Sequence, residues 1–270
     1  MVCRILSPFV FCTVLLFFGP AFAIAHDLWL IPQAKAAVGK PVLIHANVGM
    51  DFPNSEHAPD TGAFARRVVV APGGKRSDLS ADGKDELSGL LGFTPQAPGI
   101  YVIGVETKPQ IIALAADDFN AYLVSDGLAH IFQLRAKEKT LNQPARERYQ
   151  KSPKALVKVG DGSNGDAQKP MGLFLEIVPL NDPFSLKVGA TLKVRVDFQG
   201  KPLRDANLGW SYAGDAECSG SIRSDRNGEA LVPIARQGLM TIRLTHMTLP
   251  KNAEYEWESF WTTLTFRVPE

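Results

Sequence analysis

The stretch that decides the fold is "FSLKVGATLKVRVDFQGKPL", residues 184–203. Its apolar side chains recur at every second position, at Leu192, Val194, Val196 and Phe198. A period of two is typical of a β-strand with one buried face. The Gly-Lys pair that follows predicts a turn into a neighbouring strand. This part of the chain is therefore expected to form a strand of a β-sandwich.

Similar short apolar runs, bounded by Gly, Pro or Asn-Gly, recur along the chain. They are "DLWLIP" (27–32), "AAVGKPVLIHANVG" (36–49), "ARRVVVAPGG" (65–74), "APGIYVIGVETK" (97–108), "KALVKVG" (154–160), "ANLGWSYA" (206–213), "SDRNGEALVPI" (224–234), "GLMTIRLTHM" (238–247) and "SFWTTLTFRV" (259–268). Strands at this spacing indicate β-sandwiches. We predict a mainly β protein with two Ig- or transthyretin-like sandwich domains, residues 26–180 and 181–270.

The alternating pattern is interrupted between about residues 117 and 150. Phe119, Tyr122 and Leu123 follow helical spacing, and Gly127 is a stop signal. The charged stretch "PARERYQKSP", residues 144–153, also has a helical composition. The first domain is therefore predicted to carry a helical insert at about 117–150.

Residues 1–25 have the features of an export signal. A basic start is followed by an apolar run and by small residues at cleavage spacing. Cleavage after Ala23 would leave Ile24 first, and cleavage after Ala25 would leave His26 first. Either cut predicts a periplasmic protein. Only Cys218 would then remain of the three cysteines, so no intrachain disulfide is expected, and we interpret Cys218 as a buried or partly buried thiol.

Charge and motifs exclude several classes of function. The chain has 29 Lys and Arg against 28 Asp and Glu, without a basic block that would indicate nucleic-acid binding. It contains no G-x-S-x-G, P-loop, H-E-x-x-H or C-x-x-C motif. We therefore expect no enzyme of these classes.

The position of His26 suggests metal binding. As a first residue, it would offer an α-amine and an imidazole that chelate one ion, with a second imidazole completing a T-shaped copper site. As a third residue after Ile24-Ala25, it would complete a planar nitrogen set suited to Cu(II) or Ni(II). The alternative is a histidine that hydrogen-bonds a carboxylate or backbone group.

The other histidines have weaker claims. His246 shares a strand face with Ile242 and Leu244, either as a core histidine or as a ligand. His45 lies on a strand, His57 on an acidic loop where we expect it to be solvated, and His130 on the predicted helix in a structural role. The acidic turn before the last strand adds Glu258, as a ligand or as a carboxylate that orients a ligating imidazole.

Several stretches taken together resemble a family of exported bacterial proteins described as NikM-like, or nickel-uptake-related. They are "AHDLWLIP", "DFNAYLVSDGL", "ERYQKSPKALVKVG", "GLFLEIVPLNDP", "GKPLRDANL", "SDRNGEALVPI" and "LTHMTLPKNAEYEWESFWTTLTF". The second half is also similar to transthyretin-like and carboxypeptidase-regulatory-like sandwiches. The resemblance implies a periplasmic protein tied to nickel or cobalt uptake. It favours His26, His246 and Glu258, while Met50 stands where relatives tend to carry an acidic residue.

Three functions follow as hypotheses. The first is a periplasmic protein that binds nickel, cobalt or copper through His26, His246 and Glu258, and delivers it to a membrane transporter. In that case His26 and His246 should approach each other across the domain boundary. The second is a metal-free, carbohydrate-interacting sandwich that uses exposed tryptophans, namely Trp29, Trp210, Trp257 and Trp261. The third is a copper-dependent oxidative enzyme that uses an amino-terminal histidine.

Overall fold

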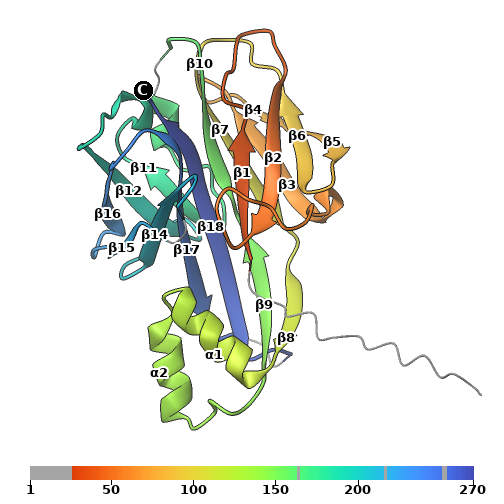
Figure 1. Ribbon diagram of the computed structural model, residues 1–270, viewed down its shortest axis with the longest axis vertical. Helices are drawn as coiled ribbons and strands as arrows, with labels where there is room; N and C mark the ends of the chain where they lie inside the picture. The colour runs from red at the N-terminus through yellow and green to blue at the C-terminus, as the bar shows by residue number, and fades with distance from the viewer. Residues whose placement is uncertain (1–25, 163–164, 216–217, 251–253) are drawn as a thin grey trace, which may run out of the picture.

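Three β-sheets form the body of the protein (Figure 1). The computed structural model describes residues 26–162, 165–215, 218–250 and 254–270, so the predicted export signal lies outside the described residues. The largest sheet, the central sheet, runs in the order β15–β14–β17–β18–β10–β7–β3–β4. The strands in this order are β15 (Gly220–Arg223), β14 (Asn207–Tyr212), β17 (Gly238–Thr248), β18 (Trp257–Val268), β10 (Lys154–Val159), β7 (Gly99–Thr107), β3 (Phe64–Val70) and β4 (Arg76–Asp78), and two further strands join the sheet beside β18.

Two smaller sheets accompany the central sheet. The N-terminal sheet has the order β1 (Asp27–Pro32), β2 (Val42–Gly49), β6 (Ser88–Phe93) and β5 (Ser80–Lys84). The third sheet contains β11 (Leu175–Pro179), β12 (Thr191–Phe198), β13 (Lys201–Pro202) and β16 (Glu229–Pro233). Short 3₁₀ helices occupy Thr61–Ala63, Gly165–Gln168 and Pro183–Ser185. All strand pairs within the two smaller sheets are antiparallel.

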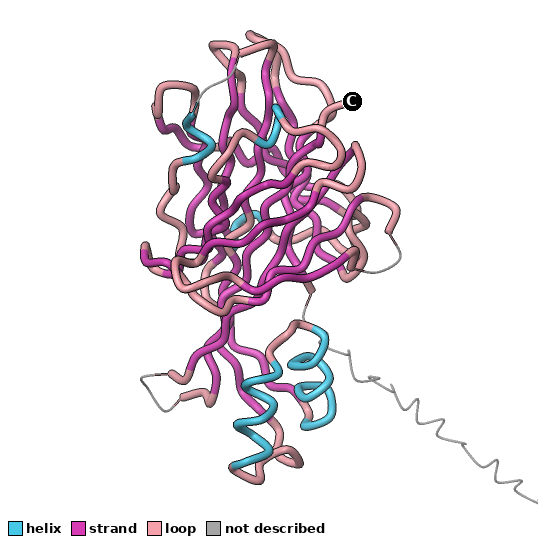
Figure 2. The backbone as a smooth tube through the Cα atoms, turned by 90° about the vertical axis from the view of Figure 1, so that its left-hand side faces the viewer, coloured by secondary structure: helices cyan, strands magenta, loops and turns pink. Residues whose placement is uncertain are grey.

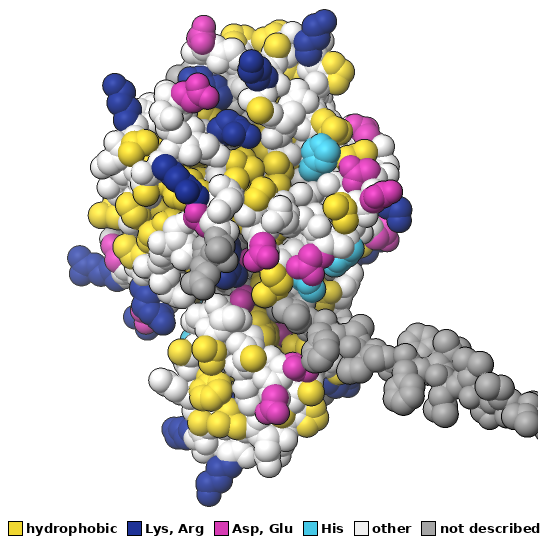
Figure 3. Space-filling view, in the orientation of Figure 1, with side chains coloured by type: hydrophobic (Ala, Val, Ile, Leu, Met, Phe, Trp, Pro, Cys, Tyr) yellow, Lys and Arg dark blue, Asp and Glu magenta, His cyan; other side chains and the backbone are white. Residues whose placement is uncertain are grey.

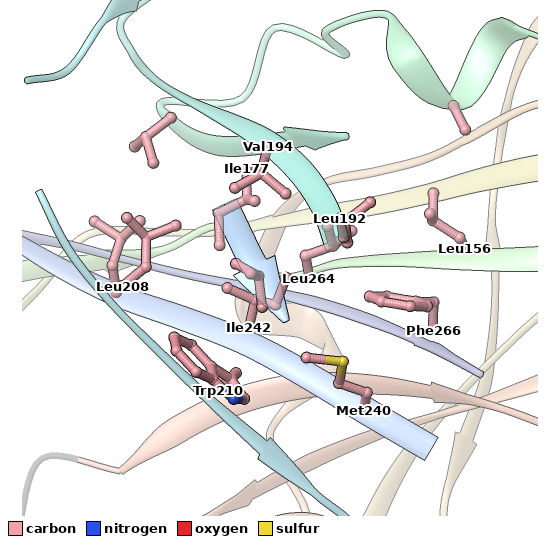
Figure 4. Close-up of a cluster of buried hydrophobic side chains, with 14 of the residues drawn as sticks. Leu156, Ile177, Leu192, Val194, Leu208, Trp210, Met240, Ile242, Leu264 and Phe266 are labelled. Atoms are coloured by element: carbon pink, nitrogen blue, oxygen red, sulfur yellow. The ribbon is translucent and has the colours of Figure 1, made fainter. Parts of the chain in front are cut away.

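The central sheet is apolar on both faces, because each face covers a separate core. On β7, Tyr101 and Ile103 belong to the core shared with the N-terminal sheet, whereas Ile100 and Val102 belong to the core shared with the third sheet. Figure 4 shows side chains of the second core. Strands buried on both faces lose the simple alternation of apolar and polar residues. This explains the nearly continuous apolar run of β7.

The predicted mainly β fold is confirmed, and so is the strand that led to it. Leu192, Val194 and Val196 are fully buried on β12, and Phe198 packs against the same core. The central sheet takes strands from both sides of residue 180, the predicted domain boundary. The strands after that residue therefore pair directly with those before it, through β10 and β18.

A helical lobe projects from the body through a narrow waist (Figures 1 and 2). It contains β8 (Gln110–Leu114), α1 (Ala116–Ser125), α2 (Ala129–Lys137) and β9 (Ala145–Lys151), which pack against the ends of β17 and β18. Phe119, Tyr122 and Leu123 are buried, as their helical spacing predicts. No helix among the described residues is long and apolar enough to cross a membrane.

The predicted helix at 144–153 is wrong. Residues 145–151 form β9, which pairs in parallel with β18 and antiparallel with β8. The charged composition suggested a helix, but the neighbouring strands satisfy the backbone of this segment as a sheet. The ion pair between Arg148 and Glu258, 2.6 Å apart, joins directly paired positions of β9 and β18. Tertiary pairing thus overrides local propensity here.

Candidate functional site

His26 immediately precedes β1, and a carboxylate holds its ring. Its Nε2 atom lies 2.8 Å from Oε2 of Glu56. The other carboxylate oxygen of Glu56 accepts the backbone N–H of Met50 at 3.0 Å. Burial acts to raise the pKa of Glu56, but these hydrogen bonds and the charges of His26 and His57 hold it below its ordinary value. The carboxylate is therefore ionised and fixed on both oxygens.

His57 provides a second imidazole beside the first. The ring centroids of His26 and His57 are 5.7 Å apart, and the rings meet edge-on at 86°. His57 is exposed, as expected for its loop, but a β-bridge to Val48 holds its backbone. Figure 3 shows histidine and acidic side chains side by side on this face, above the waist. Sequence analysis did not pair His57 with His26, because no strand or helix periodicity relates positions 26 and 57.

The hydrogen bond to Glu56 decides which nitrogen of His26 can bind a metal. A carboxylate accepts from a protonated ring nitrogen, so Nε2 carries the proton and Nδ1 carries the lone pair. A carboxylate that orients an imidazole in this way is common beside ligating histidines. If His26 is the first residue of the mature chain, its α-amine and its Nδ1 atom belong to the same residue and can chelate one ion. The residues present thus fit a site with two imidazoles and one amine.

A cavity of about 180 Å³ lies beside His57. Its lining includes Asp60, Tyr149 and Lys151. The Nζ atom of Lys151 donates a hydrogen bond to the backbone carbonyl of His26. The start of β1 is therefore tied to β9 of the lobe as well as to its own sheet.

His246 lies on β17 with a different set of partners. As predicted, it shares the face of Ile242 and Leu244, which belong to the core under the third sheet. Its ring meets that of Phe198 edge-on, with the centroids 4.7 Å apart. Burial, together with the charge of His130, lowers the pKa of His246 to about 4. The ring is therefore neutral at pH 7 and lies half-buried against Phe198.

The N-terminal strand lies on the opposite face of β17. Arg243, whose position alternates with those of the core residues, donates to Asp27 at 3.0 Å. Thr263 of β18 donates to the backbone carbonyl of Leu28 at 2.9 Å. His26 immediately precedes Asp27 and therefore lies on this side of the central sheet. The central sheet separates it from His246.

The structure does not bring His26, His246 and Glu258 together. Glu258 pairs with Arg148, while the two histidines occupy opposite faces of the central sheet. Among residues 26–162, 165–215, 218–250 and 254–270, no three His, Cys, Asp or Glu side chains lie close enough to hold a metal ion together. A metal site at His26 therefore needs a ligand that is not one of these side chains, such as the α-amine.

The remaining candidates are dispersed. His45 lies on β2, with its Nδ1 4.0 Å from Asp85. His130 is exposed on α2. Its side chain is therefore not buried, as the structural role expected for it would require. Cys218 is exposed rather than buried, and its thiol contacts the backbone carbonyls of Trp210 and Gly220.

The four tryptophans are buried, with exposed fractions of 8% or less. They are Trp29, Trp210, Trp257 and Trp261. Trp257 and Trp261 belong to the core of the lobe, and Trp210 belongs to the core under the third sheet. None of them offers the exposed ring face that stacking on a sugar requires.

A set of charged side chains crosses the waist, and we call it the waist cluster. It consists of Asp27 (β1), Asp126 (the end of α1), Glu147 and Lys151 (β9) and Arg243 (β17). Arg243 lies between the two aspartates, 3.0 Å from Asp27 and 3.8 Å from Asp126. Burial raises the pKa of Asp126 to about 6, although Arg243 opposes this shift. The cluster joins three parts of the chain that are distant in sequence.

The lobe side of the waist cluster contains two further perturbed groups. Burial raises the pKa of Glu147 to about 7, against the hydrogen bonds that it accepts from Ser259 and Tyr122. Burial lowers the pKa of Lys151 to about 8, against the nearby carboxylates. Groups with such pKa values often mark functional sites. No sequence motif indicated the waist cluster, because its five members come from four separate elements.

A family model for a domain of unknown function, DUF4198, matches residues 23–248. The chain belongs to the DUF4198 family. No curated protein matches it. Among solved structures, it is similar to the D0-D1 domain of Intimin, with 11% identity and a TM-score of 0.21, covering 89% of this chain and 97% of that one. The D00-D0 domain of Intimin gives 10% identity and a TM-score of 0.21, covering 88% and 98%. DUF4198 membership assigns no activity.

Proposed function

We propose that this DUF4198 protein is a periplasmic binding protein for a divalent transition metal, nickel, cobalt or copper, with His26 at the centre of its site. The observation that carries the proposal is the pairing of the His26 and His57 rings beside Glu56. The likeness to NikM-like sequences supports the same class of cargo. It also supports delivery of the ion to a membrane metal transporter.

The hydrogen bond between His26 and Glu56 supports one ligand set. With cleavage after Ala25, the α-amine and Nδ1 of His26 chelate the ion, and His57 supplies a second imidazole. Glu56 stays outside the ligand set and orients the ring of His26 through Nε2. With cleavage after Ala23, the amine of Ile24, two backbone amides and His26 form a set that does not need His57. Nitrogen ligands of either kind suit Cu(II) and Ni(II).

The first test is the mass of the exported protein, purified without chelator. The mass under denaturing conditions identifies the first residue. The mass under native conditions, before and after addition of nickel, cobalt or copper, gives the number of bound ions. We expect a His26 start and one ion per chain. Affinity should fall below about pH 6, because the imidazoles must be neutral to bind.

Three variants, measured by calorimetric titration of the same metals, test the ligand set. If His26 comes first, His57→Ala should weaken binding, because the α-amine and Nδ1 of His26 then remain as the only ligands. Glu56→Gln should weaken it by about 10- to 100-fold, as for other partners of ligating histidines. His246→Ala is the matched control, because this histidine lies on the other face of the central sheet, and it should bind like the wild type.

Two results would overturn the proposal or redirect it. A protein that holds no ion as purified and takes up none of the three metals is not a binding protein for this class of cargo. Metal binding that survives His57→Ala in a chain beginning at Ile24 would move the site to the Ile-Ala-His segment alone.

A further inference from the structure

A cavity lies at the waist, where Arg243 is part of its lining. Its volume is about 270 Å³. The end of α1, β14, β15 and β17 meet there, and the residues used below are Asp126, Asn207, Cys218, Ser221, Arg243 and Thr245. Most of these side chains are polar or charged. A cavity of this size, at the lower end of ligand pockets, is suited to a small polar molecule.

Opposite charges face this cavity in a fixed arrangement. The carboxylate of Asp126 is only 5% exposed and accepts a hydrogen bond from Thr245 at 2.8 Å. Both carboxylate contacts of Arg243, to Asp27 and to Asp126, are made by the same nitrogen, Nη1. The rest of the guanidinium edge therefore remains to donate to a ligand, since Arg243 lines the cavity.

A smaller cavity of about 60 Å³ shares Cys218 and Arg243 with the first. Trp29 lines it and is 1% exposed, yet its Nε1–H has no hydrogen-bond partner among the described residues. A buried donor of this kind costs free energy unless a ligand or water accepts from it. Asp51 and Asp215 line the same cavity, and Asp215 is engaged by Arg236.

The two charged side chains that line the larger cavity have opposite signs. They are Asp126 and Arg243. A ligand that carries a single charge would leave one charge uncompensated in a partly buried place, which is costly. A ligand that carries one positive and one negative charge can form ion pairs with the carboxylate and the guanidinium at the same time.

We propose that this cavity binds a small α-amino acid as a zwitterion, with its ammonium group on Asp126 and its carboxylate on Arg243. The guanidinium fork suits a carboxylate. Asn207 and Ser221 offer polar contacts to a short side chain. This site is independent of the metal site at His26, because none of its residues takes part in that site.

The test is calorimetric titration of the full exported chain with glycine, L-alanine, L-serine and L-threonine. At least one of them should bind, whereas N-acetylglycine and glycinamide, which each lack one of the two charges, should bind at least about tenfold more weakly. Acetate and methylamine probe each charge alone, and glucose probes an uncharged polyol. Equal binding of N-acetylglycine or glucose, or no binding of any of the four amino acids, would overturn the proposal.

Variants locate the site. Asp126→Asn keeps the shape of the side chain and should weaken binding of the amino acid at least about tenfold. Ser221→Phe places a large side chain at an exposed position of β15 that lines the cavity, so it should block binding in a folded protein. Arg223→Phe, two residues along the same strand and outside the lining, is the matched control and should bind normally. Full binding by Ser221→Phe would place the ligand elsewhere.

Discussion

Two groups of buried charges can be compared, the waist cluster and the pair of Lys154 with Glu176. Lys154 and Glu176 are 0% and 1% exposed, and their atoms Nζ and Oε1 lie 2.7 Å apart. The carboxylate of Glu176 also accepts the backbone N–H groups of Met171 and Gly172, at 2.7 and 3.0 Å. Neither residue lines the three cavities described above. Every oxygen of the carboxylate is thus used by the protein itself.

The waist cluster is less completely satisfied. Its aspartates meet one nitrogen of Arg243, and Arg243 lines two cavities. The pKa values of Asp126 and Glu147 are raised to about 6 and about 7. Fully paired charges hold strands together, whereas partly paired charges beside a cavity are available to a ligand. Burial alone therefore does not distinguish scaffold from site. The hydrogen-bonding positions that the protein leaves unused distinguish a binding site from a structural ion pair.

The largest expected effect comes from breaking the saturated pair. Lys154→Met should destabilise the fold by about 3–5 kcal/mol, because it leaves the carboxylate of Glu176 buried without its cation. Urea unfolding at pH 7 measures the change in the free energy of unfolding. Lys158→Met, at an exposed position of the same strand, is the control and should cost little. If Lys154→Met lowered the free energy of unfolding by less than about 1 kcal/mol, the Lys154–Glu176 pair would not be what holds these strands together.

A smaller effect, of opposite sign, is expected in the waist cluster. The pKa of Glu147 is raised from 4.5 to about 7 in the folded state, chiefly by burial. The folded protein therefore loses stability as the pH rises from 4.5 through about 7, where the unfolded chain has already released this proton. Glu147→Gln removes that loss and should stabilise the protein by about 2 kcal/mol at pH 8. Near pH 4 it should bring no gain.

Unfolding curves of the wild type and Glu147→Gln at pH 4 and pH 8 measure this difference. Glu138→Gln, on an exposed residue after α2, is the matched control and should show no such dependence on pH. An equal effect of Glu147→Gln at both pH values would show that the amide acts through packing. The difference between the waist cluster and the Lys154–Glu176 pair would then not be electrostatic.

The smallest effect is expected at a surface pair, which serves as a reference for both buried groups. Lys193 and Glu229 lie 2.6 Å apart, with side chains 45% and 28% exposed. Lys193→Met should cost less than about 1 kcal/mol, because water screens the pair. The cost should fall further in 1 M NaCl. A cost as large as that of Lys154→Met would show that exposure does not rank these pairs.

Much of the fold could be predicted from local patterns. The period of two in 191–198 and the helical spacing of Phe119, Tyr122 and Leu123 identified buried faces that the structure confirms. The segment 144–153 could not be predicted in this way. Its charged composition favours a helix, and only the neighbouring strands β8 and β18 make it a strand.

The sequence by itself determined which side chains share a face of a strand or helix, because those periods depend on the backbone alone. It singled out His26 and placed His246 on the same face as Ile242 and Leu244. Only the tertiary structure decided that His26 meets Glu56 and His57, and that the central sheet separates it from His246. The assembly of the waist cluster from β1, α1, β9 and β17 was also decided at that level. The physical reason is that these contacts join residues about 30 to 220 positions apart, and strand pairing rather than any local period sets such distances.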